Sequence, residues 1–254
     1  MGKPLFLIIG AQRAGTTSLW NYLRHCPQLT PAIPTDEYWF VFPDGQIKKY
    51  WPNGQPLKES RFFTYLFDYN NIDVYEKLFD DSKAGFEASV EYLHLPGVAE
   101  RIKTVYDDLK FIVMLRDPVD RAWSQYWHEV NFNRGETLPF EDAILRDIKT
   151  VEDYYFRAYL KTGHYAEHLK RWFELFGRDS FFIIQSEQFY RDPDYWFKAT
   201  QCFLGLDPII ELIDYSTFGI TSQYPEMAAG TRALLQKYFD RHNKKLYKLL
   251  EGEA

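Results

Sequence analysis

The sequence predicts an α/β protein in which a central parallel β-sheet lies between two layers of helices, in a P-loop-like arrangement. Three observations support this prediction. Short apolar runs alternate along the chain with longer segments of helical periodicity. The first apolar run ends in a glycine loop. Finally, no internal repeat and no linker rich in Pro, Gly or Ser divides the 254 residues, so we expect a single domain over 1–254.

Four apolar runs are the predicted strands. Residues 5–9 come directly before the glycine loop, and residues 111–115 and 181–184 are also continuously apolar, as is typical of strands buried on both faces. Residues 86–90 are a weaker candidate. The first predicted helix is expected to stop before Pro27. Apolar residues at helical spacing predict helices at about 15–24, 97–108, 119–131, 139–149, 153–176 and 226–250.

Composition narrows the function and the environment. Two cysteines far apart, Cys26 and Cys202, form no disulfide framework, which favours a reducing compartment, and we expect a cytoplasmic protein. The apolar run at 5–11 is too short to cross a membrane and lacks a signal-peptide pattern, so no transmembrane segment is expected. A formal net charge of −6 and a pI near 5.6 argue against nucleic acid as a partner, although they allow a local basic pocket.

The glycine loop reads GAQRAGTTSL over residues 10–19. Gly10 and Gly15 have the spacing of a nucleotide-triphosphate loop, but Thr16 stands where that loop has its lysine, and Arg13 is the only basic residue. Backbone N–H groups and the positive helix end hold an anion here. Because the lysine that reaches the β- and γ-phosphates is missing, the loop suits one phosphate with a second anionic group beside it. The alternative is a tight turn without a ligand. The loop residues predicted to bind phosphate are Arg13, Ala14, Gly15, Thr16, Thr17 and Ser18.

A second motif, RDPVDRAWSQYW, begins at Arg116, where the predicted strand 111–115 ends. Since open α/β sheets bind ligands at the carboxyl ends of their strands, we expect Arg116 to share a crevice with the loop. Pro118 suits the first helical position, and Ser124 lies about two turns along the helix, on a face that can meet the same anion. The alternative is an ordinary Arg-Asp pair that caps the helix.

Together these residues resemble the sulfotransferases that use 3′-phosphoadenosine 5′-phosphosulfate (PAPS), in their bacterial and heparan-sulfate-type branch. That family carries GxxKxGTTSL and RDPxxRxxSxY, and here the segments read GAQRAGTTSL and RDPVDRAWSQY. The resemblance covers about residues 5 to 252. Supporting segments are YEKLF at 75–79, YLHLPGVAERI at 92–102, FNRGETLPFEDAI at 132–144, GHYAEHLKRWFELFGRD at 163–179, RDPDYWFKATQCFLGL at 191–206 and HNKKLYKLLEG at 242–252.

The resemblance implies an enzyme that moves a sulfuryl group from PAPS to an acceptor hydroxyl or amine and releases 3′-phosphoadenosine 5′-phosphate (PAP). It implies that the loop holds the 5′-phosphosulfate and that Arg116 and Ser124 hold the 3′-phosphate. We expect no metal. Three departures weaken the match: the family's loop lysine is Arg13, the lysine of its E-K-[ST]-P-x-Y segment is Ala88, and the covering loop at 218–227 has no cation. Nucleotide binding is then weaker, or other residues contribute to it.

The resemblance offers two catalytic bases. Glu37, in TDEYWF, stands where the heparan-type branch has its glutamate, and it is our first candidate. His94 is the second, because the cytosolic branch uses the histidine of an H-L-P segment, and His94 lies 22 residues before Arg116 (116 − 94). Each has an alternative as an ordinary surface side chain. His128 shares a helix face with Ser124 at i, i+4 and is a weaker candidate.

An aromatic-rich segment at about 36–80 is the candidate acceptor wall or lid, with core packing as the alternative. The acidic balance disfavours a long polyanion as acceptor, so we expect a small-molecule, carbohydrate, lipid or polyketide-type acyl acceptor. Two other functions stay open: a P-loop nucleotide kinase or NTPase, and a catalytically inactive PAP-binding module. The candidate wall residues are Tyr38, Trp39, Phe40, Tyr50, Trp51, Phe62, Phe63 and Tyr65.

Overall fold

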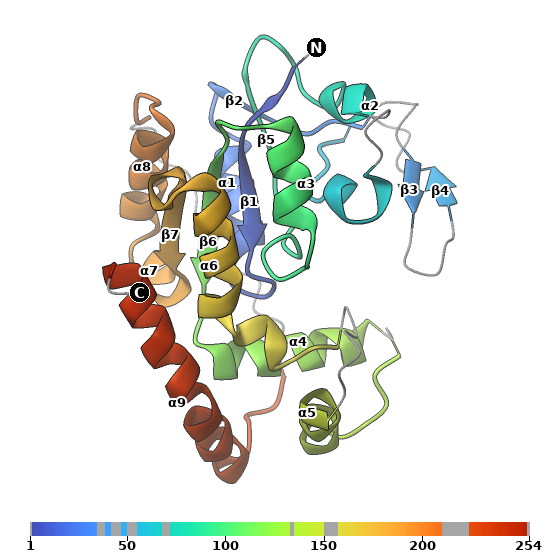
Figure 1. Cartoon of the computed structure of the whole chain (residues 1–254), viewed down its shortest axis with the longest axis vertical. Helices are drawn as coiled ribbons and strands as arrows, with labels where there is room; N and C mark the ends of the chain where they lie inside the picture. Colours follow the sequence, from blue (N-terminus) through green and yellow to red (C-terminus); the bar gives the residue numbers. More distant parts are fainter. Residues whose placement is uncertain are drawn as a thin grey trace.

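The centre of the molecule is a five-stranded sheet whose strands all run parallel, in the order β2-β5-β1-β6-β7 (Figure 1). The computed structural model describes residues 2–34, 39–41, 47–49, 55–67, 72–132, 135–149, 157–209 and 224–252. The predicted α/β fold with a central parallel sheet is confirmed. Its strands are β1 (Pro4–Gly10), β2 (Leu29–Pro31), β5 (Ala84–Glu87), β6 (Lys110–Leu115) and β7 (Phe181–Gln185), and β3 (Trp39–Val41) pairs with β4 (Ile47–Lys49) in a separate antiparallel hairpin.

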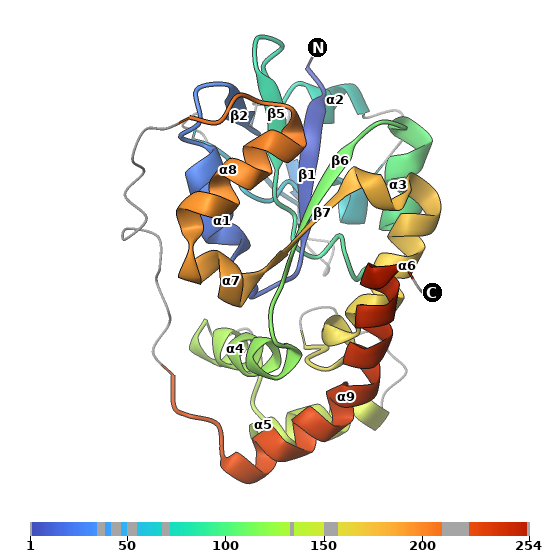
Figure 2. The same cartoon turned by 90° about the vertical axis from the view of Figure 1, so that its left-hand side faces the viewer.

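Helices cover both faces of the sheet and extend beyond one end of it. In Figure 2, α1 (Thr16–Leu23) and α8 (Pro193–Leu204) lie on one face, and α3 (Val98–Val105) and α6 (Tyr165–Phe176) on the other. Beyond the carboxyl ends of the strands lie α4 (Pro118–Asn131), α5 (Phe140–Lys149) and α9 (Ala229–Glu251). The short helices α2 (Ile72–Glu76) and α7 (Ser186–Arg191), the π-helical turn Phe62–Leu66 and two 3₁₀ turns, Lys161–Gly163 and Arg178–Ser180, complete the described elements. In the part of the chain described here, no helix is both long and apolar enough to cross a membrane.

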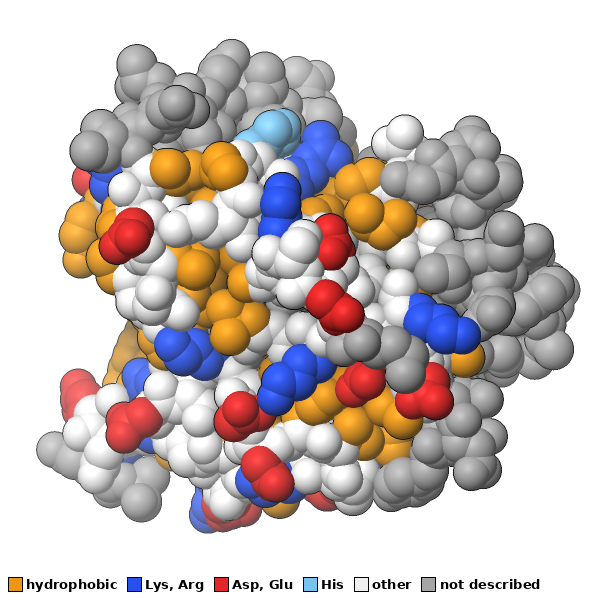
Figure 3. Space-filling view, turned by 90° about the horizontal axis from the view of Figure 1, so that it is seen from above, with side chains coloured by type: hydrophobic (Ala, Val, Ile, Leu, Met, Phe, Trp, Pro, Cys, Tyr) orange, Lys and Arg blue, Asp and Glu red, His pale blue; other side chains and the backbone are white. Residues whose placement is uncertain are grey.

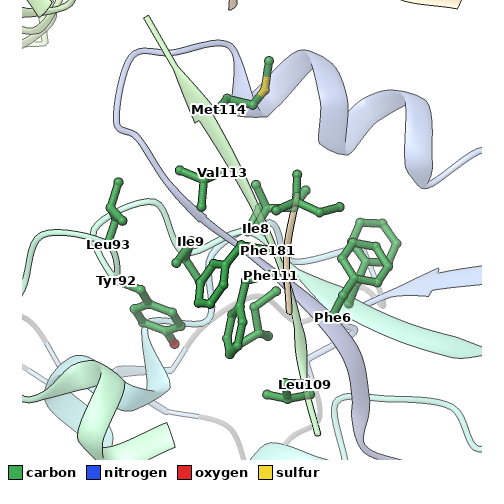
Figure 4. Packing of buried hydrophobic residues seen from close by; sticks show 14 of the residues in the cluster. Phe6, Ile8, Ile9, Tyr92, Leu93, Leu109, Phe111, Val113, Met114 and Phe181 are labelled. Atoms are coloured by element: carbon green, nitrogen blue, oxygen red, sulfur yellow. The ribbon is translucent and has the colours of Figure 1, made fainter. Parts of the chain in front are cut away.

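The apolar runs form strands because the helices exclude water from both faces of the sheet. All four side chains of residues 6–9 are fully buried, as are those of residues 111–114. Rings from neighbouring strands stack: the ring centroids of Phe6 and Phe86 lie 5.0 Å apart. Those of Phe111 and Phe181 lie 4.8 Å apart (Figure 4). The core of the protein is therefore the sheet itself, which fixes the position of the loops that follow its strands.

The order of the strands places a topological switch point between β1 and β6. From β1 the chain builds β2 and β5 on one side, and then crosses to build β6 and β7 on the other side. Open α/β sheets bind their ligands at the carboxyl ends of the strands at such a point. Gly10 ends β1 and Arg116 follows β6, so the topology brings the two predicted motifs to the switch point.

Two predicted element boundaries are wrong. The strand predicted at 86–90 ends at Glu87, because the N–H of Ala88 donates to the Lys58 carbonyl and the chain then turns back towards β1. The helix predicted at 153–176 begins only at Tyr165. Residues 157–163 form turns instead, because the Leu160 N–H donates to the Asp147 carboxylate at 2.5 Å and the fully buried Arg121 donates to the Tyr159 carbonyl. These tertiary hydrogen bonds override the helical periodicity, while residues 153–156 lie outside the described ranges.

Phe62 and Phe63 do not belong to an acceptor wall. Their exposed fractions are 2% and 0%, and Phe62 stacks on the buried Tyr75 with 4.7 Å between ring centroids. They are core residues, in accordance with the alternative stated above, because the π-helical turn packs against α3. Tyr38, Tyr50 and Trp51, with the side chains of Trp39, Phe40 and Tyr65, lie outside the described residues.

Candidate active site

At two positions of the loop after β1, Gly10 and Gly15, the backbone requires a glycine. A Cβ on Gly10 would lie 2.8 Å from the Cβ of Leu93, so the turn at 90–93 approaches the loop too closely for a side chain. Gly15 has φ +93°, a left-handed conformation, and caps α1 without a side chain of its own. The first amides of α1 consequently face the loop and are not capped by a side chain, as an anion site requires.

The structure brings Arg13, Arg116 and Ser124 together. Arg13 Nε donates to Ser124 Oγ at 3.2 Å, and Arg116 Nη1 donates to the main-chain carbonyl of Arg13 at 3.3 Å. Ser124 is 2% exposed, on the inner face of α4. Asp117 caps α4, with Oδ1 accepting from the Val119 N–H at 2.9 Å. The helix cap is therefore present together with the contacts of Arg116 and Ser124 to the loop.

Electrostatics at this junction favour an anionic ligand. Burial lowers the pKa of Arg13, the positive charge of Arg116 adds to that effect, and Tyr224 and Glu129 oppose it. A guanidinium keeps its charge at any working pH despite such a shift. Two cations next to a helix N-terminus thus make this part of the surface electropositive, which suits anionic groups with several oxygens.

Two further side chains of this site, Tyr190 and Glu129, were not predicted from the sequence. Tyr190, on α7, lies over the loop: its hydroxyl is 3.2 Å from Ser18 Oγ, and a Cβ on Gly15 would come within 2.8 Å of it. Glu129, on α4, is fully buried and close enough to Arg13 to raise its pKa. The position of Tyr190 after β7, at the carboxyl end of the sheet, is the sequence signal that could have found it.

The two predicted bases have different outcomes. Glu37 lies outside the described residues, so its role stays a prediction. His94 lies in the turn after β5, with its ring centroid 6.2 Å from that of His168. Burial, together with the charges of His168, Arg121 and Arg171, holds the pKa of His94 well below its ordinary value. The low pKa keeps this imidazole neutral and weakens it as a proton acceptor.

A second carboxylate near the loop has an unusual pKa. Burial raises the pKa of Glu91 to about 7, although Arg61 Nε lies 3.0 Å from its Oε1 and lowers it. Glu91 belongs to the turn whose Leu93 N–H donates to the carbonyl of Ile9, the residue before Gly10.

One group of potential metal ligands occurs among the described residues. His164, Glu167 and His242 place one ligating atom each within 4.8 Å of one another, between α6 and α9. The His164 and His242 rings are stacked with centroids 3.8 Å apart, and Arg241 Nε donates to His242 Nε2 at 3.2 Å. Stacked rings cannot both direct an in-plane lone pair at one ion, so the group fits a neutral histidine pair better than a metal site.

Acid should destabilise the fold through the buried histidines. Burial lowers the pKa of His164 to about 3 and that of His168 to about 4, whereas the unfolded chain titrates near 6.5. Below pH 6.5 the unfolded chain therefore binds protons that the folded chain does not. The free energy of unfolding should fall by roughly 4 kcal/mol between pH 6.5 and 4.5, about half of it from each of the two histidines. Urea titrations at several pH values measure this, and His168→Gln should flatten the slope, whereas the exposed-histidine control His25→Gln should not.

The fold is that of a P-loop-like α/β protein, with two arginines and a helix N-terminus at the end of its central strand. The chain belongs to the sulfotransferase domain family, whose model matches residues 3–245. Enzymes of this family transfer sulfuryl groups, so the predicted class is confirmed. A solved sulfotransferase from Alicyclobacillus acidocaldarius is 30% identical, with a TM-score of 0.76, over 99% of this chain and 97% of that one.

Other relatives extend the comparison. The bifunctional heparan sulfate N-deacetylase/N-sulfotransferase 4 of Mus musculus is 28% identical over 281 residues, which is 97% of this chain and 30% of that protein. The chain thus spans about a third or less of the curated relatives that it matches. The sulfotransferase domain from the curacin biosynthetic pathway shares the fold, with a TM-score of 0.54 at 14% identity over 94% of this chain and 99% of that one.

Proposed function

We propose that this chain transfers a sulfuryl group from PAPS to a hydroxyl or amine of a carbohydrate or other small acceptor. The observation that carries the proposal is the contact of Arg13 with Ser124 at 3.2 Å, which joins the loop to α4 in one site. PAPS bears two separate anionic groups, a 5′-phosphosulfate and a 3′-phosphate. The loop with the first turn of α1 suits the former, and Arg116 with Ser124 suits the latter.

The residues of the site would act mainly by electrostatics. Bound PAPS supplies an activated sulfuryl group, whose transfer leaves negative charge on the 5′-phosphate oxygen. Arg13, the N–H groups at Gly15 and Thr16, and the Ser18 hydroxyl lie where they would stabilise that charge. Glu37 is the proposed proton acceptor for the attacking group.

The names of the relatives indicate the class of acceptor that we propose. Relatives named as heparan sulfate N-sulfotransferases support a carbohydrate amine or hydroxyl as the acceptor. Figure 3 shows the end of the molecule opposite the candidate site, where acidic and basic side chains of the described residues are interspersed. Both cysteines are free, which supports the proposal of a reducing, cytoplasmic environment.

PAP should raise the melting temperature of the protein without magnesium, and ATP with magnesium should raise it less. A ligand that binds only the folded state stabilises it according to its concentration over Kd. Thermal unfolding with each ligand, with and without a chelator, measures this. Equal or greater protection by ATP and magnesium, lost on chelation, would favour the NTPase instead. PAP binding without transfer to any of a panel of hydroxyl and amine acceptors would favour the inactive PAP-binding module.

Arg116→Ala and Ser124→Ala should each weaken PAP binding by about 1–3 kcal/mol, because each leaves oxygens of the 3′-phosphate without a donor. Adenosine 5′-phosphosulfate lacks the 3′-phosphate, so its affinity should change little. Isothermal titration of both nucleotides against both variants measures the difference. Parallel losses for the two nucleotides would place the 3′-phosphate elsewhere.

A further inference from the structure

The helix that follows β7 is attached to the phosphate loop. Ser186, the first residue of α7, donates from Oγ to the Ala14 carbonyl at 2.5 Å. Near the other end of α7, the Tyr190 hydroxyl lies 3.2 Å from Ser18 Oγ, in the first turn of α1. Two hydrogen bonds from one short helix thus reach both ends of the segment that we propose for the 5′-phosphosulfate.

Tyr190 lies directly against the glycine of that loop. A Cβ on Gly15 would come within 2.8 Å of the Tyr190 hydroxyl oxygen and within 3.2 Å of two ring carbons. The phenol is also close enough to the Arg13 guanidinium to influence its pKa. The hydroxyl is therefore one more hydrogen-bond donor among the loop amides, Arg13 and the Ser18 hydroxyl.

The ring of Tyr190 is half exposed, although its hydroxyl is held in the site. Its exposed fraction is 50%, and one edge packs on Phe189, which is fully buried and stacks on Tyr22 of α1. A large aromatic ring that is anchored at its polar end and open to solvent elsewhere is suited to pack against a flat, partly apolar ligand. Aromatic side chains bind nucleobases in this way.

We propose that Tyr190 binds the donor nucleotide, with its hydroxyl donating to the 5′-phosphate and its exposed ring packing against the nucleoside. The inference rests on the proposed function, because it takes PAPS as the donor. It also assigns a source of nucleotide affinity to a chain that lacks the family's cations at position 88 and in the loop 218–227. The ligand class is a purine nucleoside with a 5′-phosphate.

Two substitutions separate the hydroxyl from the ring. Tyr190→Phe removes only the donor and should weaken PAP binding several-fold. Tyr190→Ala also removes the ring and should weaken it about tenfold or more. Tyr195, 58% exposed on the neighbouring α8, is the matched control: Tyr195→Phe and Tyr195→Ala should leave PAP affinity unchanged.

The experiment is isothermal titration of each variant with PAP and with ribose 3,5-bisphosphate, which lacks the base. The loss from Tyr190→Phe should appear with both ligands, whereas the additional loss from Tyr190→Ala should appear only with PAP. Unchanged PAP affinity in both Tyr190 variants, or equal losses with both ligands in Tyr190→Ala, would overturn the proposal. If Tyr190→Ala lowers the melting temperature, the comparison rests on Tyr190→Phe, which keeps the packing of the ring. Absence of PAP binding by the unmodified protein would instead contradict the proposed function.

Discussion

Arg13→Ala should reduce both turnover and nucleotide affinity, each by about a hundredfold. The guanidinium donates to Ser124 and lies beside Arg116, so its removal takes charge from the loop and a contact from α4 at once. Steady-state kinetics with radiolabelled PAPS, together with PAP titration, measure the two effects. The control is Arg24→Ala, which removes an exposed arginine after α1 and should change neither quantity.

Arg13→Lys tests how the arginine acts. If the positive charge alone matters, activity survives largely intact. If Arg13 must contact two oxygens at once, activity falls although the charge is kept, because an ammonium cannot make the planar two-pronged contact. Full activity of Arg13→Ala would contradict the role of the loop in binding the donor.

Glu37→Gln should lower turnover about a hundredfold or more while PAP affinity is kept. Glutamine has the shape of glutamate but cannot take the acceptor's proton. The measurement is the transfer rate at saturating PAPS over a panel of hydroxyl and amine acceptors, with PAP binding as the test of an intact site.

His94→Ala is the comparison that can reverse this assignment. Because burial and neighbouring charges already depress the pKa of His94, its loss should affect turnover less than the loss of Glu37. If His94→Ala abolishes turnover while Glu37→Gln stays active, the histidine is the base. The melting temperature of His94→Ala must be measured as well, since the ring is packed near His168.

The elements of the fold that could be predicted are those with a pattern of apolar residues within one short segment. Continuous apolar runs at β1, β6 and β7 predicted buried parallel strands, since only a sheet covered on both faces hides every side chain of such a run. The strand β2 and the helices α7 and α8 were not predicted. β2 has three residues, too few for a periodic signal, whereas α8 had a usable one: Asp192 and Pro193 form its cap and first position.

The candidate site could be predicted in part for the same reason. The loop glycines and the residues after β6 are recognisable by their spacing in the sequence. Arg13, Arg116 and Ser124 could therefore be predicted as site residues from the sequence. The environment of His94 could not be predicted, because the charges that lower its pKa come from α4 and α6. Likewise, the burial of Phe62 and Phe63 depends on packing against α3.

The sequence by itself predicted the strands β1, β6 and β7, the glycine loop after β1 and the sulfotransferase class, since the apolar runs and the two motifs are each patterns of neighbouring residues. Only the tertiary structure decided where α6 begins, that Arg13 meets Ser124, and that Tyr190 lies on Gly15. The contacts of Arg13 with Ser124 and of Ser18 with Tyr190 join residues more than a hundred positions apart, and the contacts that delay the start of α6 join residues 13 and 38 positions apart. Hydrogen bonding and packing between such distant segments form only when the sheet has set the segments side by side, so no local pattern carries them.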